Sequence, residues 1–358
     1  MSGLLDHLKA RITAQGPIDV GQYMEECLSN PDFGYYQHQQ PFGASGDFIT
    51  APDISQMFGE LLGLWAVHQW HAMGKPASFH LVELGPGRGT LMADALRAAR
   101  GAPGFIQGLH LHLVETSQRL RDIQNQALTG YQPQWHDEIG SLPAGPLIVI
   151  ANEFFDALPI QQFEYTSDGW LQRRIGVAGD RLVFSNWPPA FSVARETAAL
   201  APQPGDIFEV AQLSQIIMGQ LAMRCATDMG CALIIDYGHV QSGFGDTLQA
   251  VKDHAYAGVL ETPGEADLTA HVDFQALAGT AAAAGANTYG AIGQGDFLNA
   301  MGIQERTEVL QANATDQQRH LLLAGRDRLV NQDQMGGLFK VLAITGPQLP
   351  VPSGFQSS

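Results

Sequence analysis

Hydrophobic positions between residues 79 and 159 follow two different periods in turn. Continuous apolar runs at 79–84, 109–114 and 147–151 predict buried strands, and a further strand is expected at 132–136. Helical periods at 90–99 and 117–127 separate these runs. Because strands that alternate with helices indicate parallel βαβ units, this part of the chain is expected to form half of a doubly wound sheet.

The pattern changes on both sides of this region. Residues 1–78 predict helices and loops, and short strands after Pro159 predict an inserted β-meander. The remaining expected elements are helices at 4–12, 20–28, 55–73, 213–226, 274–284 and 307–329, meander strands at 161–165, 171–177 and 181–184, and buried strands at 232–236 and 339–344.

We therefore predict an α/β fold with a Rossmann-like core, built on a mostly parallel, doubly wound sheet, with a lid and an inserted lobe. The segments are a helical lid at 1–78, the first half of the core at 79–159, a β-meander and helix at 160–230, the rest of the core with added helices at 231–346, and a flexible tail at 347–358.

Charge and cysteine content narrow the choice of partners and compartment. The net charge of −17 disfavours nucleic acids and anionic membranes, and it fits either a basic protein segment or solubility alone. Three cysteines without a CxxC pair argue against a disulfide framework and a zinc site, so a reducing, cytoplasmic setting is expected. The N-terminus lacks a signal-peptide core, and no apolar run has the roughly 18 residues that a membrane span needs.

The strongest local motif is a glycine loop between an expected strand and an expected helix. Gly85, Gly87 and Gly89 alternate with other residues, so the backbone can turn sharply and approach a ligand. A dinucleotide fingerprint requires a glycine where Thr90 stands, whereas G-x-G-x-G is typical of methyltransferases. Glu83 is then expected to hold the amino group of S-adenosylmethionine. A tight turn without a ligand is the alternative.

A second acid follows the next strand. Glu115 could accept hydrogen bonds from both ribose hydroxyls of an adenosine ligand, a role that dinucleotide enzymes also use. Asp137 or Glu138, after the following strand, could meet the adenine amino group. An exposed strand-end acid without a ligand is the alternative for Glu115.

Candidate acceptor residues follow the fourth strand. Glu153 and Asp156 could grip and polarise a guanidinium, and Asn152 could orient either ligand. Asp156 could instead cap the next helix. Tyr237, after the strand at 232–236, is expected on the same edge and could form a wall of the site or a simple turn.

Several blocks together resemble the MidA-type class I S-adenosylmethionine-dependent methyltransferases, whose mitochondrial members support assembly of respiratory complex I. The blocks cover nearly the whole chain in the right order, at 46–60, 83–89, 152–159, 236–238, 267–274 and 335–342. The resemblance implies a class I methyltransferase core and symmetric dimethylation of an arginine on a complex I subunit. It also implies that Asp47 and Thr50 face the donor from a lid, and that Asn152, Glu153 and Asp156 face the acceptor.

Some alternatives stay open at this stage. The missing transit peptide suggests a bacterial member, and a homodimer is conceivable. The twelve histidines show no paired ligand spacing, so no metal is expected. A non-catalytic assembly factor or chaperone that keeps the donor-binding fold is one alternative, and an NAD-dependent Rossmann oxidoreductase is another.

Overall fold

The computed structural model describes residues 3–38 and 50–355, and the chain divides into two compact units. The first unit comprises Met1–Phe48, Asp156–Ile216 and Gln241–Asp273, and the second comprises Ile49–Phe155, Ile217–Val240 and Phe274–Ser358. The described part of the segment 1–78 is therefore shared between the units.

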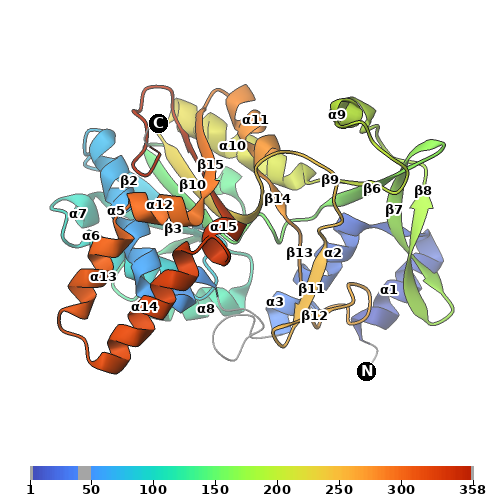
Figure 1. Cartoon of the computed structure of the whole chain (residues 1–358), viewed down its shortest axis with the longest axis horizontal. Coiled ribbons are helices and arrows are strands. Elements are labelled where there is room, and N and C mark those ends of the chain that lie inside the picture. Colours follow the sequence, from blue (N-terminus) through green and yellow to red (C-terminus); the bar gives the residue numbers. More distant parts are fainter. Residues whose placement is uncertain (1–2, 39–49, 356–358) are drawn as a thin grey trace. The chain divides into compact units, whose positions relative to one another are not determined.

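The second unit contains the parallel sheet that the sequence predicts (Figure 1). Its strands lie in the order β15-β16-β10-β5-β2-β3-β4. The bounds are β2 (Phe79–Leu84), β3 (Leu109–Val114), β4 (Gln134–His136), β5 (Leu147–Asn152), β10 (Cys231–His239), β15 (Asn287–Gly293) and β16 (Phe339–Thr345). β16 runs antiparallel to both β10 and β15, whereas the pairs from β10 to β4 are parallel.

The position of β16 separates this sheet from a dinucleotide-binding sheet. In the dinucleotide fold the sixth strand continues the order beside the fifth. Here the last strand of the chain lies between β10 and β15 and reverses the direction. The predicted mostly parallel α/β core is confirmed, and its strand order argues against the oxidoreductase alternative.

One face of this sheet packs on α5 (Gln56–Ala72) and α6 (Thr90–Ala99). Alternate strand residues such as Leu81, Leu113 and Ile150 point into this core and are at most 2% exposed. The two helices approach closely, because a Cβ on Gly63 would lie 2.3 Å from the carbonyl oxygen of Ala95. Packing of this kind holds β2 and its following loop in place.

Other helices surround the sheet and extend the second unit. They are α4 (Ala51–Ile54), α7 (Phe105–Gly108), α8 (Gln118–Ala127), η1 (Ile139–Ser141), α10 (Gln212–Thr227), α11 (Phe274–Ala283), α12 (Gln294–Ala300), α13 (Ile303–Gln311), α14 (Asp316–Val330) and α15 (Met335–Leu338). The prediction of one helix over 307–329 is wrong, because Thr315 and Gln318 form a capping box that starts α14 as a separate helix.

The first unit is built on antiparallel strands. Its larger sheet has the order β1-β7-β6-β9, with β8 added beside β7, and a smaller sheet has the order β12-β11-β13. The elements are α1 (Leu4–Gln15), β1 (Ile18–Asp19), α2 (Val20–Ser29), α3 (Tyr35–His38), β6 (Gln161–Thr166), β7 (Gly169–Ala178), β8 (Arg181–Trp187), α9 (Ala194–Thr197), η2 (Ala198–Leu200), β9 (Ile207–Val210), β11 (Gln249–Lys252), β12 (Ala255–Ala257), β13 (Asp267–Thr269) and β14 (Val272–Asp273).

Helix α2 anchors the core of the first unit. Its N-terminus carries a reciprocal capping box between Asp19 and Gln22, and its buried face includes Val20 and Tyr23. The Tyr23 hydroxyl donates to the carbonyl oxygen of Val259 at 2.7 Å.

The predicted meander is present as β6, β7 and β8. Among the described residues no helix is long and apolar enough to cross a membrane.

Candidate active site

The carboxyl ends of four neighbouring strands form one edge of the sheet in the second unit. Leu84 at the end of β2 is in register with Val114 of β3 and Ala151 of β5. Asn152 of β5 is in register with Ile235 of β10. The predicted glycine loop, Glu115, Asn152 and Glu153 therefore follow adjacent strands, at the place where ligands bind in open α/β sheets.

The glycine loop has the conformation that its sequence predicts. Gly85, Gly87 and Gly89 adopt φ angles of +60°, +51° and +79°, which other residues reach only with strain. The Gly85 amide donates to the Val114 carbonyl at 3.0 Å, and a Cβ on Gly85 would lie 2.9 Å from Cδ2 of Phe154. Gly89 caps α6, so the loop leads directly into a helix N-terminus.

Glu83 lies on β2 just before this loop and is almost fully buried. Its side chain is 3% exposed, and Oε2 has no hydrogen-bond partner among the residues that the structure describes. Burial raises the pKa of the Glu83 carboxyl to about 8. A buried carboxyl with an unsatisfied oxygen fits a ligand that brings its own cation, as the methionine ammonium of the methyl donor does.

Glu115 follows β3 and is already held by protein donors. Its Oε1 accepts from the Ser117 amide at 2.8 Å, and its Oε2 accepts from Gln124 Nε2 at 3.2 Å. Burial raises the pKa of Glu115, while these donors lower it. Each oxygen keeps a further lone pair that a ribose hydroxyl could use.

The sequence did not single out Gln124, because it is one of several polar residues of α8. In the structure Gln124 lies one turn after Leu120, and both are buried. Gln124 Nε2 also donates to the carbonyl oxygen of Gly87 at 2.8 Å. The side chain thus joins the glycine loop to Glu115.

The two acids proposed for the adenine amino group have other surroundings. Asp137 pairs with Arg121, with 2.5 Å between Oδ1 and Nη2, and its side chain is 81% exposed. Arg121 Nε also donates to the carbonyl oxygen of Glu115 at 2.8 Å. Glu138 is exposed, and its carbonyl oxygen accepts from the Ser141 hydroxyl.

Glu153, the first residue after β5, adopts an unusual backbone conformation. Its φ angle is +51°, a left-handed value that costs a non-glycine residue of order 1 kcal/mol or more. Its amide donates to the Ile235 carbonyl of β10 at 2.9 Å. Its Oε1 accepts from the Ala51 amide at 3.3 Å and from Asn152 Nδ2 at 3.0 Å. Strained residues held in this way concentrate at functional sites.

Asp236 has a structural role at the same edge. It is fully buried, and its two carboxylate oxygens accept from the amides of Phe155 and Tyr237, each at 3.0 Å. It therefore fixes the turn after β5. Tyr237 is 7% exposed and packs edge-on against Phe339.

The remaining candidates are placed differently. Asp156 belongs to the first unit, where its carbonyl oxygen accepts from the Ala270 amide at 2.9 Å. Burial, Asp267 and Asp156 together raise the pKa of Tyr36 well above its usual range. Thr50 Oγ1 donates to Asp53 at 3.0 Å. Asp47 lies outside the described residues.

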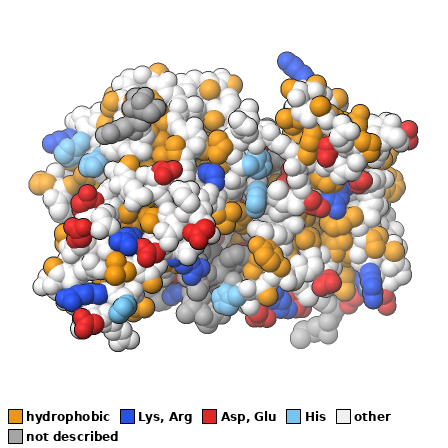
Figure 2. All heavy atoms as spheres, in the orientation of Figure 1, with side chains coloured by type: hydrophobic (Ala, Val, Ile, Leu, Met, Phe, Trp, Pro, Cys, Tyr) orange, Lys and Arg blue, Asp and Glu red, His pale blue; other side chains and the backbone are white. Residues whose placement is uncertain are grey.

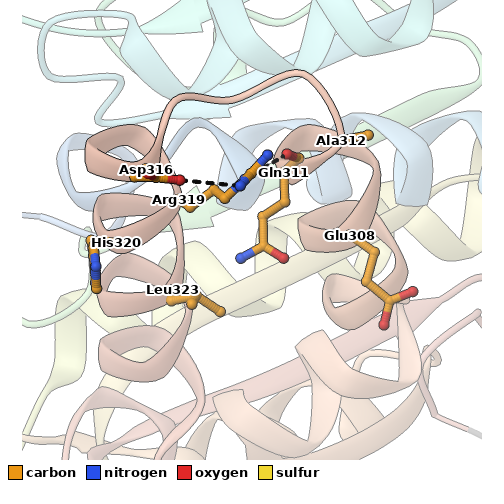
Figure 3. Close-up of a pocket in the computed structure, with 7 residues that line it drawn as sticks. All are labelled: Glu308, Gln311, Ala312, Asp316, Arg319, His320 and Leu323. Atoms are coloured by element: carbon orange, nitrogen blue, oxygen red, sulfur yellow. Dashed lines mark hydrogen bonds and ion pairs between the residues drawn. The ribbon is translucent and has the colours of Figure 1, made fainter.

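The surface pocket in Figure 3 is separate from these residues. It lies between α13 and α14 and contains Arg319, which donates to Asp316 and to the Gln311 carbonyl, each at 3.2 Å. It includes none of the candidate site residues. Figure 2 shows acidic and basic side chains interspersed over these helices, so the negative charge is not gathered there. No cluster of three potential metal ligands occurs in residues 3–38 and 50–355.

Comparison with known proteins agrees with this geometry. Residues 61–292 match the model of a family described as S-adenosyl-L-methionine-dependent methyltransferases. The chain belongs to this family.

Relatives extend the match to nearly the whole chain. Protein arginine methyltransferase NDUFAF7, mitochondrial, from Danio rerio is 39% identical, over 95% of this chain and 86% of its own length. The Homo sapiens protein of the same name is 38% identical, over 95% and 83%. The predicted membership of the MidA-type methyltransferases is confirmed.

Solved structures support the same fold. A Burkholderia thailandensis protein crystallised with S-adenosyl-homocysteine superposes with a TM-score of 0.86 at 25% identity, covering 99% of this chain and 95% of its own. A native crystal structure from the same organism gives a TM-score of 0.83 at 28% identity, covering 99% and 94%. This methyltransferase therefore shares its fold with that relative over nearly the whole of both chains.

Proposed function

We propose that this methyltransferase transfers the methyl group of S-adenosylmethionine to the guanidinium of an arginine on a partner protein. The relatives named above carry the name protein arginine methyltransferase, and the Burkholderia relative binds the demethylated donor. The observation that carries the proposal is Glu153, a carboxylate held in a left-handed turn at the strand next to the glycine loop.

The chemistry requires positioning more than acid–base power. The donor supplies an electrophilic methyl carbon next to a sulfonium. As the guanidinium nitrogen forms its bond to that carbon, the carbon–sulfur bond breaks and its electrons stay on sulfur, and the proton that the nitrogen loses passes to water or to the carboxylate of Glu153. Glu153 would accept guanidinium N–H bonds, and the Oδ1 of Asn152, which has no partner among the described residues, could accept another.

Donor binding would use the other half of the edge. Glu83 would pair with the methionine ammonium, and Glu115 would accept the ribose hydroxyls. The glycine loop would present its backbone to the chain between them. Asp156, Asp47 and Thr50 stay candidates for contacts with the acceptor or donor.

The proposal extends to a respiratory complex I subunit as the acceptor and to symmetric dimethylation, as the family resemblance implies. A cytoplasmic location is also proposed, and three buried cysteines without disulfides are compatible with a reducing compartment. A homodimer stays a prediction that light scattering at several protein concentrations can check.

Radiolabelled donor tests the proposal directly. The full chain is incubated with labelled S-adenosylmethionine and either cell lysate or matched peptides that carry arginine or lysine. We expect label on the arginine peptide and on a lysate protein, with ω-methylarginine found after hydrolysis.

Two results would contradict the proposal. Label on lysine alone would rule out the arginine assignment. Binding of S-adenosyl-homocysteine without any transfer would favour a non-catalytic assembly factor. Glu305→Gln, an exposed acid on α13, is the matched control for variants at the site.

A further inference from the structure

Gln124 makes more contacts than its place in a helix requires. It is fully buried on α8, and both ends of its amide are satisfied. Oε1 accepts from the indole Nε1 of Trp135 at 2.8 Å, while Nε2 donates to the Gly87 carbonyl at 2.8 Å and to Glu115 Oε2 at 3.2 Å. Burying such an amide is costly unless every contact is made.

The chemistry of the partners fixes the orientation of this amide. An indole N–H can only donate, whereas a carbonyl and a carboxylate can only accept. Trp135 therefore holds the Gln124 oxygen on its own side and directs the NH₂ group toward Gly87 and Glu115. A flipped amide would lose all three bonds.

The fixed Gln124 amide affects the charge of the Glu115 carboxylate and the direction in which that carboxylate points. Burial alone would favour the neutral acid, and the bonds from Ser117 and Gln124 counter that tendency. Because one NH₂ group serves both the Gly87 carbonyl and the Glu115 carboxylate, it also sets the spacing between the loop and the strand-end acid.

We propose that Gln124 is a positioning residue for the methyl donor. It keeps Glu115 ionised and aimed at the ribose, and it ties that acid to the glycine loop. This inference rests on donor binding, but not on the identity of the acceptor. A purely structural role would lower stability without changing how nucleoside binding depends on pH.

5′-Methylthioadenosine is the suitable probe, because it carries the ribose but lacks the amino group expected near Glu83. Calorimetric titrations between pH 6 and 8.5 compare the wild type with Gln124→Met, Gln124→Glu and the exposed control Gln126→Met. Gln124→Met should weaken binding by about 10-fold, the usual value of hydrogen bonds to a charged group. The loss should grow as the pH falls, because Glu115 protonates more easily.

Gln124→Glu gives the sharper result. At pH 8.5 a second carboxylate beside Glu115 repels it, so binding should be weaker than in Gln124→Met. At pH 6 the two carboxyls share a proton that can restore one bond, so binding should approach that of the wild type. The affinity of Gln124→Glu for the nucleoside should therefore rise as the pH falls, whereas the affinity of Gln124→Met should decrease. Gln126→Met should match the wild type.

A third variant leaves residue 124 unchanged, so it tests the proposal even if the variants at that position misfold. Trp135→Phe removes the donor that orients the amide and should weaken binding by about 2–3-fold in the same direction. Affinities of all three variants within twofold of the wild type, with an unchanged pH profile, would overturn the proposal. If the wild type bound neither this nucleoside nor S-adenosyl-homocysteine, donor binding itself would fail, which is a different result.

Discussion

Two carboxyl groups on neighbouring strands, Glu83 before the glycine loop and Glu153 after β5, have opposite surroundings. On the donor side, Glu83 is buried with an unpartnered oxygen, and its pKa is raised to about 8. On the proposed acceptor side, the Glu153 carboxylate accepts from the Ala51 amide, and Asp236 accepts from the amides of Phe155 and Tyr237. Glu83 thus has an oxygen that gains a partner when a cation arrives, whereas Glu153 already has protein donors.

The halves also reach left-handed backbone conformations by different means. The donor loop uses three glycines, for which positive φ angles cost little. The proposed acceptor side has Glu153 with a similar positive φ angle, which strains a residue that carries a side chain. Glycine suffices where only the backbone touches the ligand. The proposed function gives a reason for a glutamate at this position, because its side chain would hold the acceptor.

Glu153→Gln should have the largest effect on methyl transfer. The amide keeps the size of the side chain but loses the charge that grips a guanidinium. We expect kcat to fall by about 10³-fold, while the Kd for S-adenosyl-homocysteine changes less than twofold. Single-turnover assays and calorimetry measure these two quantities. If both fall together, Glu153 belongs to the donor side and the contrast between the halves fails.

Glu83→Gln should act on donor binding. Loss of the carboxylate should weaken S-adenosyl-homocysteine by roughly 10–100-fold, and it should leave 5′-methylthioadenosine unaffected because that ligand has no ammonium. Equal losses for both ligands would show that the variant damages the loop as a whole.

The raised pKa of Glu83 also predicts how donor affinity changes with pH. The free Glu83 carboxyl has a pKa of about 8, and an ammonium favours its ionised form. Wild-type binding should therefore release a proton below pH 8 and tighten as the pH rises from 6 toward 8. Calorimetry in buffers of different ionisation enthalpy detects that proton, and Glu83→Gln should not release it.

Glu115→Gln should have a smaller effect that reaches both ligands. The amide oxygen can keep only one of the two hydrogen bonds that Ser117 and Gln124 donate to the carboxylate, and the ribose loses a charged acceptor. We expect about 10-fold weaker binding of S-adenosyl-homocysteine and of 5′-methylthioadenosine alike. A selective loss of only one ligand would exchange the roles given to Glu83 and Glu115.

The sequence was sufficient for features that depend on local order. The glycine loop needs only a strand, three alternating glycines and a helix, and each appears in the pattern at 79–99. The run at 147–151 is apolar throughout, as a strand buried on both faces should be, and it forms all of β5 except its last residue, Asn152.

Features that depend on register or on distant partners could not be predicted. In the sequence Asp236 is only the last residue of the strand expected at 232–236, yet its carboxylate holds the turn after β5 by accepting from the amide of Phe155, 81 residues away. Gln124 is one polar residue on a polar helix until β4 brings Trp135 beside it. The helix expected at 307–329 is interrupted before Asp316. The capping box of Thr315 and Gln318 starts a new helix there, although the helical pattern of apolar residues continues.

The histidines show the same limit most clearly. His80 of β2, His112 of β3 and His136 of β4 form a chain, with 2.9 Å from His80 Nδ1 to His112 Nε2 and 2.9 Å from His112 Nδ1 to His136 Nε2. Only strand pairing brings them together. By the alternation of side chains, His112 points to the sheet face opposite Leu113 and the α5 core.

His112→Leu should have the smallest effect on methyl transfer and act on acid stability instead. Burial, and then the neighbouring His80 and His136, lower the pKa of His112 to about 4. Unfolded histidine titrates near 6.5, so between these values the unfolded chain binds more protons. Wild-type stability should therefore fall as the pH drops from about 6.5 to 4, by up to about 3 kcal/mol from this residue.

Urea unfolding at pH 7 and pH 4.5 measures this loss. His112→Leu should lower stability at pH 7, since two ring nitrogens lose a partner, but it should flatten the further decline toward pH 4.5. His110→Leu, an exposed neighbour on the same strand, should keep the wild-type decline. If the stability of His112→Leu declined toward pH 4.5 as much as that of the wild type, groups other than His112 would cause the acid sensitivity. Donor affinity at pH 7.5 should stay within twofold, because the hydrogen-bond partners of the His112 ring are His80 and His136, and not Glu83 or Glu115.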